Sequence, residues 1–398
     1  MSVLFRGDGW GLGGGSGQEI FLEGEEGRLL AERPGQLPDV LAALDEIAES
    51  GNPDLIAVGF FSYEAGVFLE GSTALTRPHD FLPFAEFSFF SLKAARRGAS
   101  PPPAVPATFT FDEPARAERV LSSGEWIKGV ETIRGGIARG DVYQVNLSRR
   151  TRFTARLDRF ALARSLYADN PVPFALTLAQ DDWAVVSNSP ELFLDVDLAA
   201  RRAVTKPIKG TIARGATDDE DVVLRRELLA SAKDAAENVM IVDLLRNDLG
   251  KVAEPGRVET TAIRALKSFR HLHHLESTVE VRLRKDARLS DVFRATLPGG
   301  SITGAPKRAA LRFIHDLESV PRGAYCGAAG FVRGDGRVVF NVAIRTAILG
   351  RDTVDYHAGG GIVWDSNAEA EWRETEAKSR EFGVAMGALG TGEVPREP

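Results

Sequence analysis

The sequence is poor in cysteine, in basic charge and in long apolar segments. One cysteine, Cys326, among 398 residues excludes an intrachain disulfide framework and thiolate zinc clusters, and it fits a reducing compartment such as the cytoplasm. Lys and Arg number 49 and Asp and Glu number 56, so the formal net charge is −7. This balance argues against nucleic acid as the main ligand, because a phosphate backbone calls for a basic surface. By itself the negative net charge favours a cation or a neutral molecule as the ligand over an anionic metabolite.

Membrane and export signals are missing as well. No apolar run approaches the roughly 18 residues of a membrane span. Residues 1–17 lack the apolar core of a secretory signal. We therefore expect a cytoplasmic protein without a membrane segment. Its apolar content of 43% and charged content of 26% are ordinary for a globular chain with a substantial core.

Prolines concentrate in one part of the chain, between residues 95 and 117. Adjacent prolines cannot donate backbone hydrogen bonds to a helix or a sheet, so this part is expected to be a connection. We divide the chain into an N-terminal segment over residues 1–95, a proline-rich connection over 96–116 and a larger region over 117–398.

Hydrophobic spacing predicts an α+β fold. We expect helices over residues 38–49, after the capping box Ser122-x-x-Glu125, from about 217 to 250 as one long helix, and from about 366 to 387. We expect strands over residues 55–64, 142–153, 174–197 (as a pair), 202–208, 276–283, 328–333, 337–349 and 353–358. Because the strands come in hairpin-like pairs between few helices, we expect mostly antiparallel sheets.

Two predicted helices carry acids on their apolar faces. At 100° per residue, Asp234 and Glu237 share the stripe of Ile241, and Glu371 and Glu374 are spaced in the same way on the last helix. A buried carboxylate is costly unless it is paired or metal-bound. Two such pairs could hold one hard cation, and ligands that are all oxygen favour Mg²⁺. Ordinary ion pairs with neighbouring Arg or Lys are the alternative.

Other features suit a ligand that carries carboxylates. Arg345 lies in an apolar run and offers a bidentate fork. Glycines 359–361 follow a predicted strand and let bare backbone N–H groups approach an anion, although a simple bend is the alternative. A similar glycine-rich, donor-rich turn covers residues 298–307. Lys209 lies near a strand end and is a candidate nucleophile if burial favours its uncharged amine; an exposed lysine is the alternative.

These segments together resemble the chorismate-utilising enzymes, the family of anthranilate synthase component I, aminodeoxychorismate synthase component I and the isochorismate and salicylate synthases. The matching segments are GDVYQVNLS (140–148), SPELFL (189–194), PIKGT (207–211), KDAAENVMIVDLLRNDLG (233–250), LPGGSITGAPK (297–307), YCGAAGF (325–331), FNVAIRTAIL (340–349) and GGGIVWDS (359–366). The resemblance implies an anthranilate synthase component I-like fold, in which two antiparallel β-sheets pack as a sandwich with flanking helices.

The resemblance also implies site residues. Glu237 and Glu374, helped by Asp234 and Glu371, would bind Mg²⁺, which holds the ring carboxylate of chorismate. Glu191 matches the general acid that protonates the departing 4-hydroxyl. The implied substrate-binding residues are Arg345, Tyr325, Thr211, His274, Gly360, Gly361, Lys378 and Gln144. A dianionic substrate would then bind beside local positive charge, so the negative net charge of the chain does not exclude such a substrate.

Two positions separate the branches of this family. Isochorismate and salicylate synthases have a lysine base where this chain has Gln144, which weakens a water-adding function. Anthranilate synthases usually have Ala where this chain has Lys209, and the lysine form resembles aminodeoxychorismate synthase. There the amine is thought to attack C2 of chorismate and form an adduct that ammonia then displaces at C4. Anthranilate synthase component I and a non-catalytic chorismate-binding subunit are the alternatives.

The resemblance leaves the source of ammonia open. A class I glutaminase needs a Cys-His-Glu triad, and Cys326, the one cysteine, lies in a core motif. The length also leaves no room for a fused amidotransferase domain. We therefore expect a separate glutamine amidotransferase subunit (component II) as a partner.

Overall fold

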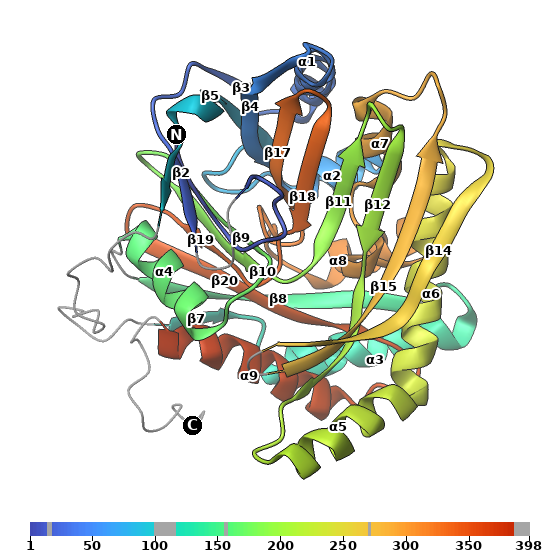
Figure 1. Ribbon diagram of the computed structural model, residues 1–398. Helices are drawn as coiled ribbons and strands as arrows, with labels where there is room; N and C mark the ends of the chain where they lie inside the picture. The colour runs from blue at the N-terminus through green and yellow to red at the C-terminus, as the bar shows by residue number, and fades with distance from the viewer. Residues whose placement is uncertain (14–17, 99–116, 155–157, 270–271, 386–398) are drawn as a thin grey trace.

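Two antiparallel sheets form the centre of the molecule (Figure 1). The computed structural model describes residues 1–13, 18–98, 117–154, 158–269 and 272–385. Most of the predicted proline-rich connection, residues 99–116, lies outside these ranges. None of the described helices is long and apolar enough to cross a membrane.

Sheet 1 has the strand order β16-β8-β20-β19-β10-β9-β1-β2-β6, with β7 beside β8. Its strands are β1 (Ser2–Arg6), β2 (Glu19–Leu22), β6 (Arg96–Gly98), β7 (Ala117–Val120), β8 (Gln144–Thr154), β9 (Phe174–Ala179), β10 (Ala184–Ser189), β16 (Gly304–Ala305), β19 (Thr346–Leu349) and β20 (Thr353–Ile362).

Sheet 2 has the order β13-β15-β12-β11-β18-β17-β4-β5-β3, with β14 beside β15. Its strands are β3 (Gly27–Ala31), β4 (Asn52–Phe61), β5 (Ala85–Ser91), β11 (Leu192–Asp197), β12 (Arg202–Lys206), β13 (Ile208–Ala213), β14 (Ala253–Ser268), β15 (Leu272–Leu283), β17 (Ala328–Gly334) and β18 (Arg337–Val342). Strands from residues 1–98 therefore pair into both sheets.

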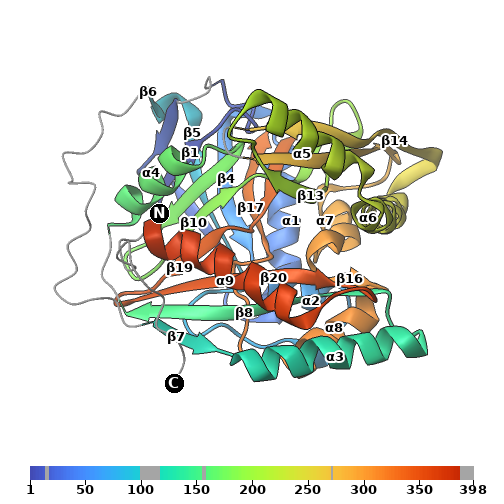
Figure 2. The ribbon, with the colours of Figure 1, turned by 90° about the horizontal axis from the view of Figure 1, so that it is seen from below.

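Helices cover the outer faces of this sandwich. They are α1 (Leu37–Ala48), α2 (Tyr63–Leu69), α3 (Ser123–Arg139), α4 (Arg159–Asp169), α5 (Asp218–Ala230), α6 (Ala232–Gly250), α7 (Leu289–Thr296), α8 (Lys307–Leu317) and α9 (Ala368–Ala385). Figure 2 shows α9 lying along β20 and α3 along β8, while α6 runs beside β14 in Figure 1. This arrangement confirms the predicted α+β sandwich.

Apolar side chains between the two sheets form one core cluster. Phe5 of sheet 1 meets Phe331 of sheet 2 edge to face, with ring centroids 6.1 Å apart. A second cluster packs helices on the outer face of sheet 2, where Phe61 lies 4.9 Å from Phe293 of α7. Each buried aromatic ring removes a large apolar area from water, so these contacts fix the layers.

Two neighbouring chain segments cross from one sheet to the other. β10 pairs with β19 in sheet 1, whereas β11 pairs with β18 in sheet 2. The links between them, residues 190–191 and 343–345, are called the crossing segments here. Backbone hydrogen bonds bind their ends: Val342 N donates to Glu191 O at 3.0 Å, and Asn188 N donates to Arg345 O at 3.1 Å.

The crossing corrects two strand predictions. The expected strand over 337–349 is two strands in different sheets, because the chain must bend to leave one sheet for the other. Arg345 lies at this bend with φ of 50°, in the left-handed region that non-glycine residues rarely adopt. The expected pair over 174–197 is likewise three strands, β9, β10 and β11.

Two further predictions need correction. The long helix expected from about 217 to 250 is two helices, because Ser231 has an extended ψ of 111° and its side chain caps α6 by accepting from Asp234 N. Glycines 359–361 lie inside β20 and pair with β8 instead of forming a bend after a strand. A Cβ at Gly359 would overlap Leu147 O, so the close approach of these strands needs glycine. The long strand β14 escaped prediction.

The capping box at residue 122 is confirmed and gives a test of α3. Glu125 N donates to Ser122 Oγ at 3.3 Å, and Ser122 N donates to Glu125 Oε2 at 2.8 Å. We expect Ser122→Ala to lower the free energy of unfolding by about 1 kcal/mol in urea denaturation, since it leaves helix N–H groups uncapped. Ser122→Thr keeps the hydroxyl and should stay close to the parent protein. An unchanged midpoint in Ser122→Ala would contradict a stabilising cap.

Candidate active site

Glu191 lies on the first crossing segment and is 4% exposed. Its Oε1 accepts a hydrogen bond from Ser301 Oγ at 2.8 Å. Burial raises the pKa of Glu191 to about 7, and the hydrogen bond from Ser301 and the charge of Lys209 oppose this rise. Near neutral pH a substantial fraction of this carboxyl keeps its proton, so it can act as a general acid.

Lys209 is placed by a β-bulge in β13. Ile208 pairs with Glu276 and Thr211 pairs with His274, so three steps along β13 (211 − 208) match two along β15 (276 − 274). The extra residue lies at Lys209 and Gly210, and Gly210 has φ of 82°. Half-buried Lys209 places Nζ 3.5 Å from Ser301 O. The bulge therefore brings Lys209 to the segment that also binds Glu191.

The predicted metal ligands lie on α6 and α9. Burial raises the pKa of Glu237, and the negative charges of Asp234 and Glu371 add to this effect, whereas Lys209 and Lys233 oppose it. Glu371 is 6% exposed, and its Oε1 accepts from Ser366 Oγ at 2.8 Å and lies 3.7 Å from Lys233 Nζ. Three of the four acids therefore influence one another across the two helices.

Glu374 is turned toward another partner. It is 56% exposed and forms an ion pair with Lys378 at 2.7 Å. Within the described ranges, no three Asp, Glu, His or Cys side chains form a group able to hold a metal as they stand. The oxygen donors of α6 and α9 nevertheless suit Mg²⁺. An exposed i,i+4 ion pair is worth only about 0.3–0.5 kcal/mol, so releasing Glu374 toward a cation costs little.

The end of β20 adjoins these acids. A Cβ at Gly360 would lie 3.1 Å from Glu371 Oε2, and one at Gly361 would overlap the amide nitrogen of Gln144. Gln144 is fully buried, and neither atom of its amide has a hydrogen-bond partner among the described residues. Such an unpaired buried amide is costly and is suited to a ligand that supplies the missing bonds. Lys378 Nζ donates to Gly359 O at 2.9 Å and fixes the same strand end.

A second group of predicted residues includes His274, on which the charge of Arg345 acts. Thr211 is exposed and lies across from buried His274. Burial and the charges of Arg345 and Lys267 lower the pKa of His274 to about 4, so its imidazole is neutral at pH 7. Its Nε2 has no partner among the described residues and can therefore bind a ligand.

Tyr325 lies deeper than these residues. It is buried, and its ring stacks on His357 with centroids 5.1 Å apart. The next residue, Cys326, ties this segment to the second crossing segment, because its N–H donates to Ala343 O at 2.9 Å. Tyr325 is thus anchored beside the crossing, with its ring packed against sheet 1.

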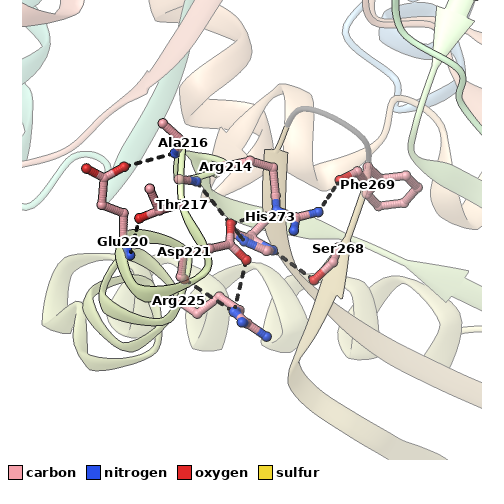
Figure 3. A network of polar contacts seen from close by, with 10 residues as sticks. Arg214, Ala216, Thr217, Glu220, Asp221, Arg225, Ser268, Phe269 and His273 are labelled. Carbon is pink, nitrogen blue, oxygen red and sulfur yellow. Dashed lines mark hydrogen bonds and ion pairs between the residues drawn. The ribbon is translucent and has the colours of Figure 1, made fainter.

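Sequence reasoning missed a polar network that holds the far end of β13 (Figure 3). Asp221 of α5 accepts from Arg214 Nε at 2.6 Å and pairs with His273 Nε2 at 2.9 Å, while Ser268 Oγ lies 2.8 Å from His273 Nδ1. The hydrogen bond from Arg214 holds the pKa of Asp221 well below its usual range. The network joins α5 to the ends of β13, β14 and β15, and so supports the strand that carries Lys209.

A family profile described as chorismate binding enzyme matches residues 13–383. The chain belongs to the chorismate binding enzyme family. Aminodeoxychorismate synthase component 1 of Klebsiella aerogenes is 42% identical over 271 residues, which cover 68% of this chain and 59% of that protein. Anthranilate synthase component 1 of Saccharolobus solfataricus is 40% identical over 270 residues, which cover 68% of this chain and 62% of that protein.

The chain thus spans about three fifths of the length of these two relatives of the chorismate binding enzyme family. Among solved structures, anthranilate synthase component I from Streptococcus pneumoniae superposes with a TM-score of 0.76 at 27% identity and covers 92% of both chains. An isochorismate synthase described as DhbC from Bacillus anthracis has a TM-score of 0.74 at 22% identity, which supports the fold alone. The predicted family and its fold are therefore confirmed.

The environment of Glu191 predicts its titration. Infrared difference spectra of the free protein should show a buried carboxyl that titrates near pH 7 and is absent from Glu191→Gln. Lys209→Met removes a positive charge that favours the carboxylate, so it should move this titration to higher pH. Lys206→Met is the control, because Lys206 is a neighbouring lysine that is not among the main causes of the shifted pKa of Glu191. Titration at the usual pH of a glutamate in the parent protein would refute the proton-donor assignment.

Proposed function

We propose that this chain is aminodeoxychorismate synthase component I, which converts chorismate and ammonia to 4-amino-4-deoxychorismate for p-aminobenzoate and folate synthesis. The observation that carries the proposal is the bulge that brings Lys209 to the Ser301 segment beside Glu191. A nucleophilic amine and a carboxyl with a pKa of about 7 form the acid and nucleophile pair that such a substitution needs.

The proposed reaction has two displacements. Once it has lost its ammonium proton, the Lys209 amine attacks C2 of chorismate, both ring double bonds shift, and the 4-hydroxyl leaves as water with the proton of Glu191. Ammonia then adds at C4, both double bonds shift back, and the lysine nitrogen leaves C2. The Glu191 carboxylate takes up the proton that the added ammonia loses. The balance is exchange of a hydroxyl for an amino group with release of one water.

Substrate binding in this proposal uses two ends of the site. Arg345 and Tyr325, with backbone N–H groups of Gly360 and Gly361, would bind the enolpyruvyl carboxylate. Thr211 and Lys378 would support the ring carboxylate, and the unpaired polar atoms of His274 and Gln144 would bind ligand hydroxyls or ring edges. The left-handed backbone of Arg345 fits a residue held in place by its function.

Mg²⁺ belongs to this proposal as the cofactor. Glu237, Glu371, Asp234 and Glu374 would hold it, and it would supply positive charge next to the ring carboxylate. The oxygen-only donors on two facing helices support the choice of this cation. Without a cation, their mutual repulsion raises the cost of ionising Glu237.

A separate glutamine amidotransferase would supply the ammonia. Cys326 is buried, and burial raises the pKa of its thiol to about 12, so it is a poor candidate for a glutaminase nucleophile. The relatives named component 1 fit an assembly with a second component. Free ammonia at high concentration is expected to replace this partner at lower efficiency.

Anthranilate synthase component I is the second candidate, because a relative with this name is 40% identical, against 42% for a relative of the first group, and a solved structure with this name has a TM-score of 0.76. With chorismate, Mg²⁺ and ammonium, we expect 4-amino-4-deoxychorismate, identified by mass spectrometry and by conversion to p-aminobenzoate with an added lyase. Anthranilate with pyruvate would establish the second candidate instead. No turnover with ammonium or with a glutaminase partner would favour a non-catalytic chorismate-binding subunit.

Lys209 decides the covalent route. Lys209→Ala should lower the rate of 4-amino-4-deoxychorismate formation by orders of magnitude, because it removes the amine that attacks C2 in this proposal. Rapid quenching of the parent protein with chorismate should yield an adduct on the peptide that contains Lys209. Lys206→Ala, on the adjoining strand, is the matched control and should keep its activity. Full activity of Lys209→Ala would exclude a lysine adduct.

A further inference from the structure

Ser301 contacts both residues on which the proposed reaction depends. Its side-chain Oγ donates to Glu191 Oε1 at 2.8 Å, and its backbone oxygen lies 3.5 Å from Lys209 Nζ. The residue is 8% exposed, so these contacts are shielded from bulk water. A single residue therefore fixes the distance between a carboxyl on one crossing segment and an amine on the bulge of β13.

We propose that Ser301 is a positioning residue that orients the carboxyl of Glu191 for proton donation and holds it in register with Lys209. This inference rests on the proposed function, in which Glu191 protonates the leaving hydroxyl. A hydroxyl that donates to Oε1 keeps that oxygen as an acceptor. With Oε1 held as an acceptor by Ser301, the acidic proton of Glu191 is placed on Oε2.

The backbone around Ser301 is held rigidly. Ser301 lies in the short 3-10 helix Gly300–Ile302. Buried Arg322 donates to Ile302 O at 2.9 Å, and Asn146 N donates to Thr303 O at 2.8 Å. Because the neighbouring carbonyls are bound in this way, the carbonyl of Ser301 already faces Lys209 before substrate binds. The contact between Ser301 and Lys209 is therefore preorganised.

The close packing of this segment against α6 also fixes Ser301. A Cβ at Gly300 would come 2.7 Å from Leu244 Cδ2, so glycine lets the segment approach the helix that carries the predicted metal ligands. Further along, Lys307 Nζ donates to buried Asp248 Oδ2 at 2.7 Å and fastens the start of α8 to α6. The segment that carries Ser301 thus packs on the acidic helix α6, while Ser301 itself contacts Glu191 and Lys209.

The charges around Glu191 define what removal of the hydroxyl does. Lys209 on β13, the N–H of Ile208 and the Ser301 hydroxyl favour the carboxylate, whereas burial and Glu276 on β15 favour the protonated acid. Loss of the Ser301 hydroxyl removes a hydrogen bond that stabilises the charged form of Glu191, so the pKa of this buried carboxyl rises. It also frees the carboxyl to rotate, so fewer bound complexes have the proton directed at the substrate.

Ser301→Ala is the test, with Ser301→Thr as the conservative variant. We expect Ser301→Ala to lower kcat about 10- to 100-fold with little change in KM for chorismate. At constant free ammonia concentration, the loss of activity at high pH should move upward by about one pH unit. Ser301→Thr keeps the hydroxyl and should restore both values toward those of the parent protein.

Thr303→Val is the matched control, because Thr303 Oγ1 bonds to Gly299 O in the same segment and does not contact Glu191. This variant tests whether any weakening of the segment has the same effect, and we expect it to leave the pH profile of activity unchanged. An unchanged kcat in Ser301→Ala, or equal losses in Ser301→Thr and Ser301→Ala, would overturn the positioning role.

The infrared titration of Glu191 in free protein separates this inference from the proposed function. An upward shift in Ser301→Ala, absent from Thr303→Val, supports the contact whichever product the enzyme forms. No shift refutes it even if 4-amino-4-deoxychorismate is the product.

Discussion

The site depends on the place where two paired chain segments leave one sheet and enter the other. β10 pairs with β19 and β11 pairs with β18, and backbone hydrogen bonds join the two connections where they bend. A chain that changes sheets must turn its backbone polar groups and side chains away from the ladder at the bend. Glu191 and Arg345 occupy these bends, so the acid and the carboxylate-binding arginine of the proposed site are fixed by the same constraint that closes the sandwich.

The second structural element of the site is the bulge in β13. One extra residue turns Lys209 toward the segment 297–307, while the network around Asp221 and His273 holds the far end of the strand. Bulges are common where a strand must redirect a side chain without ending its pairing. Here the bulge and the first crossing segment both contact the segment 297–307, which explains why Ser301 meets residues more than 90 positions away in the sequence.

The protonation states of groups in this region depend on where each group lies more than on the net charge of the chain. The chain has a net charge of −7, yet burial holds a proton on Glu191 near pH 7 and keeps His274 neutral. Facing acids on α6 and α9 form a region that suits a cation, and Arg345 and Lys209 lie close enough to influence buried groups beside it. A dianionic substrate is therefore compatible with an acidic protein, because the local field decides binding at distances within a Debye length.

The sequence by itself determined the family, the α+β class and the helices with strong local signals, such as α3 with its capping box and α1 with its apolar stripe. Those features depend on neighbours in the chain. It could not determine that residues 337–349 change sheets at Arg345, that Ser231 divides a helix, or that Gly359–Gly361 stay inside a strand. It also gave no sign that Ser301 joins Glu191 to Lys209. Only the tertiary structure decided these points, because bulges, crossings and long-range hydrogen bonds arise from packing between segments far apart in the chain.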